Sequence, residues 1–150
     1  MTEIIIKGLD KLIAKFKNAP KTLDREMNKR MKASLEVLHE KVPPYIPQVV
    51  PPEVYKRQGT LGKSLGVTPY GDKVGKPTVY SISGSGKDKQ GRFGTNLSYA
   101  KYVIDAKQQA YMHKPGYKGR PGWWTMKNIK ENALPKIQKL WDDLVKALLK

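Results

Sequence analysis

A regular spacing of apolar residues in the first third of the chain constrains the fold more than any other feature. Leucine, methionine and valine recur there every three or four residues, which places them on one face of a helix. The series is Leu23, Met27, Met31, Leu35, Leu38 and Val42. Pro43 and Pro44 follow directly, and a proline removes a helical hydrogen bond and clashes with the preceding turn. We therefore predict a long amphipathic helix that ends at about residue 42.

A second series of the same kind lies near the C-terminus and predicts a second long helix. It consists of Ile129, Ala133, Ile137, Leu140, Leu144 and Leu148, and Trp141 and Val145 widen the apolar stripe. Pro135 falls inside this segment, where it either occupies the first turn of the helix or bends it. A shorter series, from Leu9 to Phe16, predicts a further helical segment near the N-terminus.

Between and before these helices the sequence is typical of β-structure. The isoleucines at 4–6 predict a short strand, and residues 64–68, 78–82 and 92–96 predict three more. Residues 99–104 predict a short helix or turn. Because strands and helices occupy separate segments, we expect an α+β fold, a small antiparallel sheet packed by a long N-terminal and a C-terminal helix. The length of 150 residues predicts a single domain over residues 1–150.

Three segments are predicted to be loops. Residues 43–58 contain five prolines, which favour an extended and partly rigid arm. Residues 84–91 and 107–122 are rich in glycine and lysine and predict exposed loops. The arm also carries apolar residues that would suit a segment lying on a neighbouring surface, and we regard five of them as candidate contacts with another subunit: Tyr45, Ile46, Val49, Val50 and Tyr55.

The chain is strongly basic. It has 29 lysines and arginines against 13 acidic residues, a formal charge of +16. Such a charge fits nucleic-acid phosphates, an anionic membrane surface or acidic patches on another protein, and it also fits a solvated lysine-rich surface. Only five of the cations are arginine, the side chain that most often reads base edges. General electrostatic attraction is therefore favoured over sequence-specific recognition.

The sequence offers little for catalysis. The absence of cysteine excludes disulfides and thiolate metal sites, and His39 and His113 lack a metal-binding spacing. Gly62-Lys63-Ser64 resembles the end of a phosphate-binding loop, but the glycine required five residues earlier is Arg57. We predict no catalytic residue, no cofactor and no metal. No apolar stretch approaches the ~20 residues of a membrane helix and the start does not resemble a signal peptide, so we expect a cytoplasmic protein or part of something assembled there.

Residues 113–124 interleave cations with aromatic residues. Lys114, Lys118 and Arg120 precede Trp123 and Trp124. Such a segment can stack on bases and neutralise phosphates, or it can contribute the Trp, Tyr and Arg side chains that dominate protein interfaces. In a third interpretation the two tryptophans simply pack under the C-terminal helix. The residues alone do not decide between the three.

The order and spacing of several short motifs resemble a known family. Residues 6–12 read Ile-Lys-Gly-Leu-Asp-Lys-Leu, residues 58–64 read Gln-Gly-Thr-Leu-Gly-Lys-Ser, and residues 94–103 read Gly-Thr-Asn-Leu-Ser-Tyr-Ala-Lys-Tyr-Val. With an aromatic and proline-containing stretch before the last helix, this layout resembles the tail-component family of long-tailed lambdoid-type bacteriophages. These are neck proteins, also called tail-completion or head–tail connector proteins. Gln58 stands where the family usually has threonine, and residues 104–106 replace its usual glutamate and glycine-threonine.

The resemblance implies a virion structural protein of the neck, assembled in the host cytoplasm. It would form a ring, six- or twelve-fold, at the head–tail junction and join or complete the tail. Its partners would be other neck proteins and tail terminator or tail-tube proteins, with non-specific contact to packaged DNA and none to a membrane. The arm residues with Trp123 and Trp124 would then contact neighbouring subunits, and Lys114, Lys118 and Arg120 would contact DNA or acidic surfaces. The alternative is a sequence-independent nucleic-acid-binding protein; an inhibitor or toxin acting on a host factor has no supporting motif.

Overall fold

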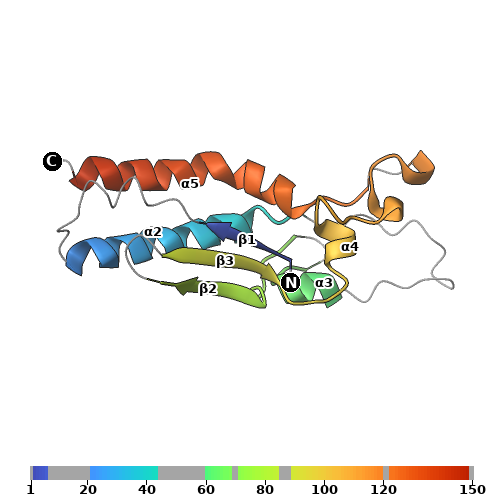
Figure 1. Cartoon of the computed structure of the whole chain (residues 1–150), viewed down its shortest axis with the longest axis horizontal. Coiled ribbons are helices and arrows are strands. Elements are labelled where there is room, and N and C mark those ends of the chain that lie inside the picture. Colours follow the sequence, from blue (N-terminus) through green and yellow to red (C-terminus); the bar gives the residue numbers. More distant parts are fainter. Residues whose placement is uncertain are drawn as a thin grey trace.

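The computed structural model describes residues 2–6, 21–43, 60–68, 71–84, 89–119 and 122–148. In this part of the chain a small sheet is covered by two long helices that run side by side (Figure 1). The strands are β1 (Thr2–Ile6), β2 (Val79–Ser83) and β3 (Gln90–Thr95). The helices are α2 (Lys21–Glu40), α3 (Thr60–Leu65), α4 (Lys101–Ile104) and α5 (Met126–Leu148), with two short 3-10 turns, η2 (Tyr111–His113) and η3 (Tyr117–Gly119).

The three strands form an antiparallel sheet in the order β1-β3-β2. Ile4 and Tyr80 both lie opposite Phe93, which is fully buried at the centre of the core. Side chains alternate between the two faces of a strand, so Gly91 shares the face of Phe93. A side chain at Gly91 would meet Met31 and Leu35 of α2, which identifies this face as the one that α2 covers. The predicted α+β fold with a small antiparallel sheet is confirmed.

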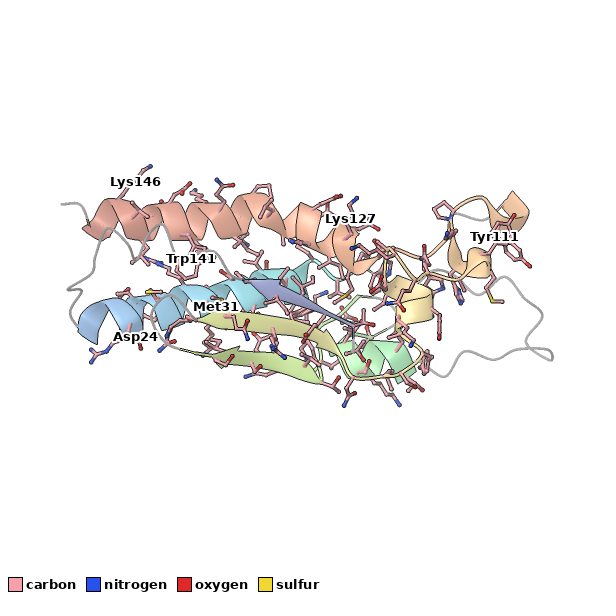
Figure 2. The ribbon with its side chains drawn as sticks, viewed as in Figure 1. Asp24, Met31, Tyr111, Lys127, Trp141 and Lys146 are labelled. Atoms are coloured by element: carbon pink, nitrogen blue, oxygen red, sulfur yellow. The ribbon has the colours of Figure 1, made fainter. Side chains whose placement is uncertain are left out.

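Helix α2 provides the central apolar face of the molecule. Met27, Met31, Leu35 and Leu38 are buried at the predicted helical spacing, and Figure 2 shows Met31 between α2 and the sheet. Beyond the helix end, the ammonium of Lys73 donates a hydrogen bond of 2.9 Å to the carbonyl of Val42. A cation there offsets the partial negative charge of the last helical carbonyls.

Helix α5 packs along α2 and also contacts β1. Its inward face contains Ile129, Ala133, Ile137 and Leu144, as the spacing predicts. The indole N–H of Trp141 donates to the buried hydroxyl of Ser34 on α2 over 3.1 Å. Figure 2 shows Trp141 directed from α5 toward α2. The two helices are therefore held by a specific polar contact as well as by apolar burial, and Pro135 lies inside α5 rather than in its first turn.

The predicted strand at residues 64–68 is wrong. Residues 60–65 form α3, and Gly66 adopts a left-handed conformation with φ 71°. The N–H of Gly66 donates to the carbonyl of Lys63 (3.1 Å), and the N–H of Val67 donates to that of Gly62 (2.9 Å). This pair of bonds is the Schellman motif that ends helices at glycine, so Gly66 terminates a helix here.

The other local predictions differ from the structure by smaller amounts. Strands β1, β2 and β3 confirm those predicted at 4–6, 78–82 and 92–96, and α4 confirms the short helix predicted within 99–104. The predicted loop at 84–91 ends earlier, because Gln90 and Gly91 belong to β3, and the loop at 107–122 contains η2 and η3. The predicted helix at 9–16 and the arm beyond Pro43 lie outside the described residues.

Candidate interaction surface

Exposed apolar side chains gather at one end of the molecule. Tyr99 and Tyr102 are about half exposed beside and on α4, while Tyr111 is 76% and Met112 61% exposed in η2. Figure 1 places α4 and the segment that contains η2 and η3 at the end opposite the C-terminus, and Figure 2 shows Tyr111 at the limit of that end. Elsewhere in the described part of the chain, the large apolar side chains exposed to this degree are Val74 and Leu134.

The segment that carries Tyr111 and Met112 is fixed at its base by hydrogen bonds. We call residues 105–119, with their return at 122–123, the projecting loop. The Gln109 side chain is buried, and its amide nitrogen Nε2 donates to the carbonyls of Val103 (2.7 Å) and Trp123 (3.2 Å). One side chain thus joins α4 to both arms of the loop. A buried amide that lost these partners would be costly, so the contact defines the path of the chain.

Backbone contacts reinforce this base. The N–H of Ala110 donates to the carbonyl of Tyr102, and the N–H of Trp123 donates to that of His113, each over 2.8 Å. Gly122 has φ 76°, and a β-carbon there would collide with the backbone of Pro115. Only glycine combines this conformation with so close an approach of two chain segments. The loop therefore projects with a defined shape.

The electrostatic character of this end is basic. Residues 101–119, which run from α4 to η3, contain four cations and a single acidic residue, Asp105, a net charge of 4 − 1 = +3. The carboxylate of Asp105 accepts hydrogen bonds from the backbone N–H groups of Lys107 (2.8 Å) and Gln108 (3.2 Å). The ammonium of Lys101 lies 5.0 Å from the ring centre of Tyr102, a favourable cation–π distance. The four cations are Lys101, Lys107, Lys114 and Lys118.

Two of the motifs identified in the sequence meet beneath this end. The hydroxyls of Ser64 in α3 and Thr95 at the end of β3 are buried and lie 2.6 Å apart. Ser64 donates to the carbonyl of Leu61 (2.6 Å), and Thr95 accepts from the N–H of Leu97 (3.2 Å). Hydrogen bonds through these two hydroxyls link the segments 58–64 and 94–103. This link explains why polar residues occupy the two buried positions.

Comparison with known families identifies the group to which the molecule is related. Residues 10–105, which are 96 of the 150, match the family described as "Bacteriophage HK97-gp10, putative tail-component". The chain belongs to this family. The resemblance inferred from the motifs is thereby confirmed at the level of a phage tail component. Comparison with curated proteins and with solved structures gave no match.

The match to the tail-component family ends at Asp105, which is the first residue of the projecting loop. The rest of the loop and α5 therefore lie beyond the matched range. The junction of Ser64 with Thr95 lies within it. The family description thus applies to α2, α3, α4 and the strands β2 and β3 of this tail component, whereas β1 lies before the matched range. It assigns no role to the exposed end of the loop.

The structure places the sequence-predicted contact residues of the tail component as follows. Trp123 and Trp124 are partly buried, pack against the core and stack edge to face with ring centres 5.7 Å apart. This placement agrees with the interpretation in which they pack near the last helix, and their contact with a neighbouring subunit stays a prediction. Lys114 is exposed. The side chain of Lys118 is outside the described part of the structure, as are the whole of Arg120 and the arm residues Tyr45, Ile46, Val49, Val50 and Tyr55.

The most exposed large apolar residues of this end, Tyr111 and Met112, were not among the predicted contacts. The signal for them was an apolar pair directly before the cationic stretch that begins at His113. A short apolar pair between polar residues is equally compatible with burial, so the sequence could not assign them to the surface.

The described residues contain no cluster of three histidine, aspartate or glutamate side chains that could hold a metal ion. Among the helices of that part, none combines the length and the apolar character needed to cross a bilayer.

Proposed function

We propose that this tail component is a virion structural protein that assembles as a ring at the head–tail junction and there joins or completes the tail. Membership in the tail-component family supports this proposal. The observation that carries it is the gathering of Tyr102, Tyr111 and Met112 at one end of the molecule, on a loop fixed at its base. Exposed aromatic and methionine side chains are typical of protein interfaces. We infer that the protein acts by contact rather than by catalysis.

The two ends of the molecule support a ring rather than a two-fold dimer. A subunit whose contacting surfaces differ forms heterologous contacts, and these close into rings when the rotation between subunits allows it. The basic, aromatic end differs from the end where α5 finishes, since Asp142 and Asp143 are exposed there. We propose six- or twelve-fold symmetry, with the 43–58 arm, Trp123 and Trp124 contacting neighbouring subunits. Other neck proteins and terminator or tail-tube proteins would bind above and below.

The experiment that tests this proposal measures assembly. We expect the purified protein, alone or with the neighbouring neck and tail proteins, to give closed rings of one size by electron microscopy and a matching mass by sedimentation. We also expect antibodies to the protein to label the neck of virions. A chain that stays monomeric at all concentrations and is absent from virions would contradict the proposal.

Nucleic-acid binding is the second candidate function, and the charge of +16 with the exposed Lys114 favours it. A protein of this kind would bind duplex DNA as a monomer, with an affinity that falls steeply as salt rises because counterions are released from the phosphates. Tight monomeric binding at physiological salt would favour this candidate. Weak binding that disappears at physiological salt would indicate that DNA makes only a non-specific contact with the protein in the channel of a ring.

A further inference from the structure

The exposed end of the projecting loop presents both apolar side chains and cations. Tyr111 and Met112 expose apolar side chains, while Lys107 and Lys114, four residues before and two after this pair, are exposed cations. Tyr111 also contacts the ring of Tyr117 edge to face, with 5.3 Å between ring centres. A side chain so placed buries a large area on binding at a low entropic cost, because tyrosine has few rotatable bonds.

The base of the loop is held by contacts within the chain. Gln109 links it to α4 and to its own return segment, and Gly122 packs directly against the backbone at Pro115. A surface held in one shape loses little conformational entropy on binding, which favours affinity. These contacts position Tyr111 and Met112 without using their side chains.

The charge of this end determines which partner it fits. Residues 101–119 carry four cations and one acidic residue, a net charge of +3, and the carboxylate of that residue, Asp105, already accepts two hydrogen bonds. The projecting loop of a second copy carries the same cations, so two such loops would repel each other on approach. Duplex DNA would satisfy the lysines, but its outer surface of phosphates would bury neither Tyr111 nor Met112. A protein segment with both carboxylates and apolar side chains satisfies both properties.

We propose that the projecting loop, through Tyr111, Met112, Lys107 and Lys114, binds an acidic segment of another protein that also presents apolar side chains. This inference depends on the proposed function in one respect, which is that the partner is another protein of the virion. Apolar burial on Tyr111 and Met112 supplies most of the affinity. The lysines increase the association rate and select for acidic partners.

The proposal is tested with defined probes and the intact protein. We would measure fluorescence anisotropy with a peptide of about fifteen residues that alternates glutamate with leucine and phenylalanine, polyglutamate of the same length, and duplex DNA of about 20 base pairs. The alternating peptide should bind at least about tenfold more tightly than polyglutamate, because buried aromatic side chains dominate interface energetics. In the double variant Tyr111→Ser/Met112→Ser its affinity should fall to that of polyglutamate.

Two further variants separate the apolar and charged contributions. Leu134→Ser removes an apolar side chain of similar exposure from α5 and should leave peptide binding unchanged. Lys107→Glu/Lys114→Glu should weaken both acidic probes and remove most of the salt dependence. Both positions are exposed, so we expect all the variants to fold, which urea unfolding would verify.

Several results would overturn the inference. They are failure of the alternating peptide to bind, equal binding of the two peptides, and a serine double variant that weakens DNA binding as much as peptide binding. Loss of self-association in that variant with unchanged peptide binding would instead identify a second copy as the occupant. Ring assembly is measured on the same preparation. Rings without peptide binding reject this inference alone, and peptide binding without rings rejects the proposed ring alone.

Discussion

The body of the molecule and the projecting loop are held together in different ways. In the body, α2, α5 and the sheet bury apolar side chains such as Leu38, Phe93 and Ile129 almost completely. Among the side chains that the structure describes between residues 105 and 119, the buried one is the polar Gln109, and hydrogen bonds hold the loop in place. Burial of apolar surface is the larger stabilising contribution. Changes in the body should therefore unfold the protein, and changes at the loop should alter its contacts.

The largest effect is expected at Gly94, inside the body. A β-carbon there would collide with the backbone of β1 at Thr2 and Glu3, so Gly94→Ala must displace an edge of the sheet. We expect a loss of about 3 kcal/mol in the free energy of unfolding, measured by urea denaturation. Gly75→Ala is the control, because that site has open space around it and only its positive φ disfavours alanine, at a cost of about 1 kcal/mol. Equal losses would show that β1 tolerates the intrusion.

A smaller loss is expected at the buried junction between α3 and β3. Ser64→Ala leaves the hydroxyl of Thr95 without its partner 2.6 Å away, and an unsatisfied buried hydroxyl costs about 1–3 kcal/mol. Ser81→Ala, at an exposed position of β2, should change the free energy of unfolding very little. If Ser64→Ala proved as neutral as Ser81→Ala, the junction would not join the two motifs energetically.

The loop should respond locally. Gln109→Ala removes the donor to the carbonyls of Val103 and Trp123, and we expect the amides of the loop to exchange at least about tenfold faster with solvent. Because local opening of the loop lets water reach these two carbonyls, the free energy of global unfolding should fall by only about 1 kcal/mol. Gln108→Ala, at the exposed neighbouring position, is the matched control. A global loss comparable to that of Gly94→Ala would remove the distinction between body and loop.

The smallest effect concerns the alkaline limit of stability of the body. Burial, with a further contribution from Glu36, raises the pKa of Tyr80 above its ordinary value of 10.0. The folded state then keeps the phenol proton at a pH where the unfolded chain has lost it, so stability is full below pH 10 and falls as the pH rises beyond it. Tyr80→Phe should flatten this fall in urea unfolding series between pH 9 and 11. An unchanged slope would mean that Tyr80 does not titrate differently on folding.

The sequence predicted the body better than the loop for a physical reason. The buried faces of α2 and α5 follow from the spacing of residues such as Leu35 and Ile137, since helical periodicity is a local property. The error at 64–68 arose where a short alternating segment is ambiguous and Gly66 alone terminates the helix. The position of Tyr111 depends on Gln109, whose partners are six and fourteen residues away. No periodic pattern records contacts of that kind.

Whether the exposed residues of the loop serve contact in the virion and not folding can be tested in the phage that encodes this tail component. Virus lacking the gene would be supplied with wild-type protein, with Tyr111→Ser/Met112→Ser or with Leu134→Ser, and the titre of infectious particles would be counted. We expect the double variant to keep the wild-type midpoint of urea unfolding and to reduce the titre at least about tenfold, with heads and tails left unjoined, while Leu134→Ser restores it. A double variant that folds normally and restores the full titre would show that the projecting loop makes no essential contact in the virion.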